Sequence, residues 1–216
     1  MANQVATSLY NKLANEFELR QAHSSGVTDT ILSGLRKQAF DNFKAKGFPS
    51  IKEEDWRFTS LVPFLDTDYS LSGYPAAENM IAEAVRKALI PSLNGYRIVL
   101  LNGSIHAGLS LLPPPEMATI VPVKDIIHTE AYKEQLASFT KTEGNTLTAL
   151  NSAFFSDGFY LEIKKDAVVD KPLEFIHIYT SVENVFFQPR HLVVVNRNAK
   201  AEMVETSITL HDRKLV

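Results

Sequence analysis

Cysteine is absent from the 216 residues of this sequence. Disulfide bonds, catalytic thiols and thiolate ligands for a metal cluster are therefore excluded within the chain. A composition of this kind is consistent with a reducing compartment, where disulfides are rare.

Long apolar runs are also missing. Lys12, Asn15 and Glu16 interrupt the N-terminal region, so it has no apolar core of signal-peptide length. Stretches such as Ile98–Leu101 are far too short to span a bilayer. We therefore predict a cytoplasmic protein.

Charge of one sign does not dominate, since 22 Lys and Arg residues face 25 Asp and Glu residues for a formal net charge of −3. Such a balance creates no field that gathers nucleic acid or anionic lipid, so neither is expected as a partner. The hydrophobic fraction of 45% and the charged fraction of 22% are ordinary for a globular protein. A chain of this length buries about 70% of its surface and needs no covalent staple.

Catalytic signatures are missing as well. The sequence has no phosphate-binding loop, no dinucleotide fingerprint, no paired-histidine zinc motif and no nucleophile elbow. We therefore predict a non-enzymatic chain, and we assign no catalytic, cofactor-binding or metal-binding residues.

Helical spacing dominates the first part of the chain. Thr28 is the predicted N-cap of a second helix, which Gly47 and Pro49 end. A further helix is expected over Glu78–Leu89, stopped by Pro91. The apolar faces of the three helices are Val5, Leu9, Leu13 and Phe17; Ile31, Leu32, Leu35, Ala39 and Phe43; and Ile81, Ala84, Val85 and Ala88.

Ser50 and Glu53 have the spacing of a capping box, which predicts a short helix through Trp56. This explains the acidic run Lys52–Asp55 better than a metal site does, because acidic groups suit a helix N-terminus. Trp56 is the only tryptophan. We expect it to be a buried anchor near Phe40 or Phe43, with a partner-binding hot spot as the alternative.

Strand patterns follow from about residue 96, interrupted by a helix predicted over Asp125–Ser138. From about residue 150 the chain reads as strand and turn with no helix, so a βαβ sheet is not expected. A sandwich, a barrel and a β-helix remain open. The predicted strands are Arg97–Leu101, Ala118–Val121, Phe159–Ile163, Leu173–Tyr179, Leu192–Val195 and Met203–Leu210.

Histidines offer little metal chemistry by spacing. His177 and His191 fall fourteen residues apart in predicted strands, and stacked strands would bring them together. We favour two separate surface or rim histidines over a metal site. Arg190–His191, directly ahead of a predicted strand, is a pattern that can bind a phosphate or a carboxylate, but a solvated strand end is the simpler interpretation. The remaining histidines are His23, His106, His128 and His211.

Family resemblance adds to these observations. Leu35–Phe40 leads into Gly47-Phe48-Pro49 and then into Glu53–Leu61, which contains Glu-Asp-Trp-Arg-Phe-Thr. This resembles the N-terminal signature of the SufB/SufD family of the SUF iron–sulfur cluster assembly system, in its SufD form. Two weaker matches agree with it. They are Leu150–Phe154 with Asp157-Gly158, and Gln188–Val195 with Ala199–Glu205. Asn151 followed by Asp157-Gly158 also suits a polar pocket, but turn chemistry leading into a strand is the simpler interpretation.

The resemblance implies an α+β fold, with a helical region over residues 1–95 and the first part of a right-handed parallel β-helix over 96–216. It also implies a non-catalytic scaffold that acts with a SufB-like subunit and a SufC-type ABC ATPase. No cofactor is expected on this chain alone, and an iron–sulfur cluster is expected only transiently in the complex. Family members are about twice this length, so we expect a truncated chain whose functional residues lie mostly in the missing half.

Two alternatives remain. A β-helix enzyme, of the polysaccharide lyase or acyltransferase type, needs clustered catalytic groups or strict hexapeptide repeats, and neither is visible. A plain protein-binding module needs no cluster chemistry. If the chain ends at Val216, we expect self-association through the open end of the β-helix, or fraying after about residue 200. Val204, Ile208 and Leu210 are the apolar residues expected to be exposed there.

Overall fold

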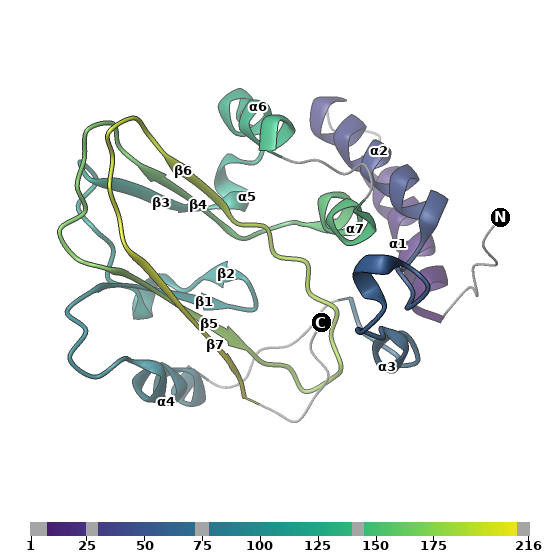
Figure 1. Ribbon diagram of the computed structural model, residues 1–216, viewed down its shortest axis with the longest axis horizontal. Helices are drawn as coiled ribbons and strands as arrows, with labels where there is room; N and C mark the ends of the chain where they lie inside the picture. Colours follow the sequence, from purple (N-terminus) through teal and green to yellow (C-terminus); the bar gives the residue numbers. More distant parts are fainter. Residues whose placement is uncertain (1–7, 25–29, 72–77, 140–144, 211–216) are drawn as a thin grey trace. The chain divides into compact units, whose positions relative to one another are not determined.

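The structure is a computed structural model that describes residues 8–24, 30–71, 78–139 and 145–210 (Figure 1). It divides into two compact units. The helical unit consists of residues 1–69 and 127–155, and the strand unit consists of residues 70–126 and 156–216. The chain thus passes between the units more than once. From the sequence we expect a single boundary between the helical and the strand region, at residue 95.

Packing explains this difference. Helix α4 (Glu78–Ala88) lies on a sheet of the strand unit, because Ile81 and Val85 pack against Val99 and Ile176. Helices α6 (Glu130–Phe139) and α7 (Thr146–Phe154) belong to the helical unit, where both contact α2 (Thr30–Lys46). The position of a helix along the chain does not reveal which helix or sheet its apolar face packs against.

In the helical unit, α1 (Ser8–Ser24) and α2 bury the predicted faces. Leu9, Leu13 and Phe17 are buried on α1, which confirms the described part of that face. Ile31, which was predicted to lie on the buried face of α2, is 50% exposed, so this part of the prediction is wrong. Val5 and the expected cap Thr28 lie outside the described residues. The buried residues of α2 are Leu32, Ala39, Phe40 and Phe43.

Phenylalanine rings fill the interior of the helical unit. The rings of Phe17 and Phe40 stack with centroids 4.0 Å apart, and Phe154 of α7 meets each of them edge-on at 5.8 Å. The guanidinium of Arg20 lies 5.4 Å from the centroid of Phe154. Offset and edge-to-face rings are the favourable aromatic geometries, so this cluster holds the helices together through packing.

Helix α7 was not predicted. The sequence indicates strand and turn from about residue 150, whereas the structure has a helix that ends at Phe154. Asn145 caps the helix: its side-chain oxygen accepts from the Thr148 amide at 3.0 Å. Ala149, Leu150 and Phe154 are buried. Thr146 and Ser152 are buried as well, so polar and apolar residues do not divide this nine-residue helix into the exposed and buried faces that mark a helix in sequence.

The turn after α2 follows the prediction in part. Gly47 ends the helix with a φ of 71°, and Glu53 accepts from the Ser50 amide at 2.9 Å. The Ser50 hydroxyl, however, accepts from Lys52 rather than from Glu53. The helix that follows is a single 3-10 turn, η1 (Glu54–Trp56), and α3 (Val62–Leu65) comes shortly after it.

Trp56 is only half-buried, so the expected deeply buried anchor is wrong. Phe43 instead packs its ring against Tyr10, Phe40 and Phe48. Phe58, two residues further on, is 88% exposed, and the guanidinium of Arg57 lies over its ring at 4.6 Å. The alternative of a partner-binding surface around Trp56 stays a prediction.

Two sheets form the strand unit (Figure 1). The first has the order β2-β1-β5-β7 and the second has the order β3-β4-β6. Strands β1, β5 and β7 are parallel to one another, as are β4 and β6, while β1–β2 and β3–β4 are antiparallel. From β4 onward, successive strands alternate between the two sheets. The elements are β1 (Tyr96–Leu101), β2 (Ser104–Ile105), η2 (Ala107–Leu109), β3 (Ala118–Pro122), α5 (Val123–Ile126), β4 (Phe159–Ile163), β5 (Leu173–Tyr179), β6 (Leu192–Val195) and β7 (Met203–Thr209).

All six predicted strands are confirmed, with small shifts at their ends. The helix expected over Asp125–Ser138 is split into α5 and α6. The two sheets share one core, in which Ile98 and Phe175 of the first meet Phe159 and Leu161 of the second. Residues of β5 therefore alternate between this core and the face covered by α4.

Strand β7 pairs with β5 along one edge and ends the order of its sheet in the described part of the chain. Met203 and Glu205 are exposed. Val204, Ile208 and Leu210, expected to be exposed, are instead half-buried, and Leu210 packs against the cluster around α4. The alternation of the strand decides this, because α4 covers only one face of the sheet.

Candidate functional site

Two histidines distant in sequence meet inside the strand unit. His177 lies on β5, and His191 directly precedes β6, so it is not a strand residue. Their ring centroids are 5.4 Å apart. His191 also stacks on Phe159 at 4.2 Å, and Phe159 in turn stacks on Phe175 at 4.6 Å. The favoured interpretation as two separate surface histidines is therefore wrong, while the juxtaposition expected from stacked strands is confirmed.

Backbone contacts hold His191 in this position. The Phe159 amide donates to His191 Nδ1 at 3.1 Å, and the Arg190 amide donates to the carbonyl oxygen of Asp157 at 2.9 Å. Gly158, between these two contacts, has a φ of 152°. A Cβ there would lie 1.8 Å from the Arg190 carbonyl oxygen, so only glycine allows the two segments to approach.

A second turn supports the same segment. Gly103, with a φ of 90°, approaches Pro189 so closely that an added Cβ would lie 2.5 Å from the proline Cβ. The side chain of Asn102 makes a pair of hydrogen bonds with the Thr180 backbone, each 2.9 Å long. Two Gly-containing turns thus fix residues 189–191 against the end of the sheets.

Asp157 connects these turns. Its carboxylate accepts from the Ser104 hydroxyl at 2.6 Å, and the ammonium of Lys124 lies 3.8 Å away. The turn signal at Asp157-Gly158 is visible in the sequence, but its neighbours are not. The contact of Asp157 with Ser104 and that of Asn102 with Thr180 join segments 53 and 78 residues apart, which no local pattern encodes.

Burial controls the protonation of both imidazoles. His177 is only 6% exposed, and burial lowers its pKa against an opposing effect of Glu205. Burial, followed by the neighbouring His177, lowers the pKa of His191 to about 4, against an opposing effect of Asp157. Both rings are therefore neutral at neutral pH. Burial and Glu205 also raise the pKa of Tyr179.

The tautomer of His191 follows from its backbone contact. An imidazole nitrogen that accepts a hydrogen bond carries no proton, so the proton of neutral His191 is on Nε2. A metal-bound histidine normally donates the N–H of its other ring nitrogen to a nearby acceptor, whereas Nδ1 of His191 accepts from an amide. The described residues contain no group of three or more His, Asp or Glu side chains that could hold a metal ion. This geometry gives no support to metal binding by the pair.

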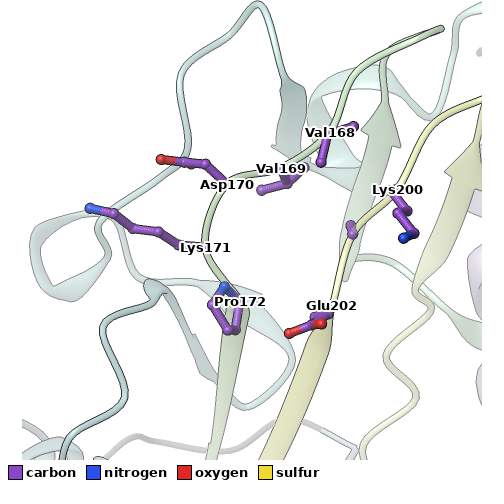
Figure 2. Close-up of a pocket in the computed structure, with 8 residues that line it drawn as sticks. Val168, Val169, Asp170, Lys171, Pro172, Lys200 and Glu202 are labelled. Carbon is purple, nitrogen blue, oxygen red and sulfur yellow. The ribbon is translucent and has the colours of Figure 1, made fainter.

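A hollow of about 290 Å³ lies elsewhere in the strand unit, between residues 168–172 and 200–202 (Figure 2). These segments lie side by side, joined by the Val169 amide to the Lys200 carbonyl at 2.9 Å. Asp170 and Lys171 extend to one side of the hollow and Lys200 to the other, so the charged groups do not converge (Figure 2). Asp170 also accepts from the Tyr96 hydroxyl at 2.8 Å. The histidine pair is the better candidate site.

The other residues singled out in sequence do not join this site as side chains. The acidic run at Lys52–Asp55 is exposed in the helical unit, and Asn151 lies within α7. Arg190 is half-buried, and its backbone amide donates to the Asp157 carbonyl oxygen. The interpretation of Arg190–His191 as a solvated strand end is therefore wrong. His106 is half-buried beside η2, His128 is exposed, His211 lies outside the described residues, and only the backbone of His23 is described.

Comparison with known proteins places the chain in a family. It matches the family described as the SufBD protein N-terminal region over residues 5–175. The chain therefore belongs to the SufBD family. A curated relative from Synechocystis sp., described as an iron–sulfur cluster assembly SufBD family protein, is 28% identical over 192 residues. That alignment covers 86% of this chain and 41% of the relative, so the chain spans about two fifths of the relative's length. In the described part of the chain, no helix is long and apolar enough to cross a membrane.

Proposed function

We propose that this chain acts as part of a non-catalytic scaffold in iron–sulfur cluster assembly. The family match over residues 5–175 carries the proposal, and the name of the Synechocystis relative agrees with it. The motif around Trp56 favours the SufD type within the family. Cytoplasmic location remains an expectation from the sequence.

The iron–sulfur cluster is cargo in this proposal, and partners supply most of its ligands. The chain contains no cysteine, and thiolates are the usual ligands of such clusters. A SufB-like subunit would therefore hold the nascent cluster with this chain. A SufC-type ABC ATPase would supply ATP hydrolysis, since the sequence has no phosphate-binding loop.

We also propose that the strand unit begins a right-handed parallel β-helix. Two observations support it: strands from β4 onward alternate between two sheets, and they pair in parallel with the strand reached one turn earlier. The bridge between Val168 and Lys200 repeats this relation at the corner of the turn. No strand in the described part of the chain pairs with the outer edge of β7. A further strand or a second copy would add there, and self-association through this edge stays a prediction.

Co-purification tests the proposed function. The tagged chain is expressed with the SufB-like and SufC-type subunits of its own organism, and the recovered complex is assayed for bound iron and acid-labile sulfide. We expect recovery of the SufB-like subunit, with iron and sulfide present in the complex and absent from the chain alone. In the matched control, the same two subunits are expressed with the tag alone in place of the tagged chain.

Three outcomes would contradict this assignment. One is ATPase activity of the purified chain that a point change within it abolishes. Another is stable, stoichiometric iron and sulfide on the chain alone after anaerobic reconstitution. The third is recovery of unrelated partners without either subunit, which is the result expected of a plain protein-binding module. A β-helix enzyme would be recognised by turnover of a polysaccharide or an acyl donor by the chain alone.

A further inference from the structure

The hydrogen bond between Phe159 and His191 depends on the protonation state of the ring. Neutral His191 offers Nδ1 as an acceptor, and the Phe159 amide uses it at 3.1 Å. A protonated imidazole has donors at both nitrogens and no acceptor. Adding a proton to His191 therefore turns this contact into two N–H groups that face each other.

His177 adds to the unfavourable effect of a proton. Both of its ring nitrogens are buried without a hydrogen-bond partner among the described residues, so only the carboxylate of Glu205 opposes the cost of a charge placed there. A charge on either ring would also repel a charge on the other across 5.4 Å between centroids. The charged and titratable groups that face the pair are Glu205 of β7, Tyr179 of β5 and Asp157 before β4.

The two carboxylates do not cancel this effect. Asp157 is already engaged by the Ser104 hydroxyl and by Lys124, and Glu205 is exposed to solvent, which screens its charge. The neutral state of the pair is therefore the one that the surrounding structure stabilises.

We propose that His177 and His191 form a proton-operated clasp. While both rings are neutral, the hydrogen bond from the Phe159 amide to His191 holds residues 189–191 against the first residue of β4. When the pair takes up a proton, the clasp opens and the segment leaves Gly103 and Gly158. Opening uncovers the stacked rings of Phe159 and Phe175 between the two sheets.

The pH range of opening follows from proton linkage. In the closed form the pKa of His191 is about 4, whereas a free histidine has a pKa of about 6.5. Between these values the open form binds a proton that the closed form does not. Opening thus becomes more favourable as the pH falls through this range, by up to about tenfold per pH unit, and levels off below it.

Hydrogen exchange at the Phe159 amide tests the clasp in the intact chain. After correction for intrinsic exchange, we expect its protection to fall on the order of twentyfold between about pH 7.5 and about pH 5. The Ile176 amide, in the centre of the first sheet, serves as the reference for global unfolding. Global unfolding also frees both histidines, so protection at Ile176 falls with pH as well. Protection at Phe159 equal to that at Ile176 at every pH would overturn the proposal, since the Phe159 amide would then exchange only through unfolding of the whole unit.

The variant His191→Asn separates titration from contact, because its side-chain oxygen can accept from the Phe159 amide and does not titrate. We expect protection at Phe159 to lose its pH dependence in this variant and to keep it in the control His128→Asn. Equal pH dependence in His191→Asn and the wild type would refute the clasp.

A measurement on the wild type covers the case in which His191→Asn fails to fold. The imidazole nitrogen chemical shifts of His191 report which nitrogen carries the proton. We expect the Nε2–H tautomer at neutral pH and the doubly protonated ring only near pH 4. An Nδ1–H tautomer, or titration near the pKa of a free histidine, would overturn the proposal.

Discussion

The two units have interiors of different chemical character. In the helical unit, Phe17, Phe40 and Phe154 form a cluster of hydrocarbon rings. In the strand unit, the stack begins in the same way with Phe175 and Phe159 but continues into His191 and His177. These three phenylalanine rings do not titrate, whereas the stack in the strand unit ends in two imidazoles that do.

This difference shows how polar groups can enter a core at the end of a sheet. A phenylalanine cluster gains stability from burial alone, so any position in the unit can hold it. A buried imidazole needs a hydrogen-bond partner, and His191 finds one in the Phe159 amide because two Gly-containing turns bring the backbones together. His177 has no such partner among the residues that the structure describes, so it is the weaker of the two positions.

The largest expected effect comes from the helical interior. Phe40→Ala removes a ring that is buried and stacked on Phe17, and we expect it to lower the free energy of unfolding by about 3–5 kcal/mol. Urea denaturation measures this. Ile31→Ala, on the exposed side of the same helix, is the control and should stay within about 0.5 kcal/mol. A small effect of Phe40→Ala would show that this cluster is not the core of the unit.

A smaller loss is expected from the turn that supports the histidines. Gly158→Ala places a Cβ against the Arg190 carbonyl oxygen and should destabilise the chain by about 1–3 kcal/mol. Gly34→Ala is the matched control: Gly34 lies in α2 with no atom within 4 Å of an added Cβ. The control should stabilise the chain by about 0.5–1 kcal/mol, because alanine favours the helix. Thermal unfolding distinguishes the two, and equal effects would contradict the close approach at Gly158.

The smallest expected effect is a gain. His177→Phe removes two buried nitrogens that have no hydrogen-bond partner in the described part of the chain, and it makes the second interior resemble the first. We expect the free energy of unfolding at neutral pH to rise by about 1 kcal/mol. His128→Phe, at an exposed position, should leave it within about 0.5 kcal/mol. A clear loss of stability in His177→Phe would mean that the imidazole does have a compensating partner in the folded chain.

Local patterns in the sequence were sufficient for much of the secondary structure. The four-residue spacing of Leu9, Leu13 and Phe17 identified α1, and alternation identified strands such as β4 and β5, because these periodicities follow directly from backbone geometry. Helix α7 was missed because it is only nine residues long and buries two of its polar residues, Thr146 and Ser152, so polarity along the sequence does not mark its exposed side. Trp56 was misplaced because residue size alone does not tell on which side of a turn a side chain lies.

By itself, the sequence determined that this chain has no thiol chemistry and no phosphate-binding loop, and that it carries the motifs of its family. The tertiary structure decided which distant segments meet. Asn102-Gly103, Asp157-Gly158 and residues 189–191 are separate turns in the sequence, and strand pairing places them at one end of the same unit. His177 and His191 become a pair for the same reason: contacts between sheets depend on register and packing across the whole unit, which no local pattern of residues encodes.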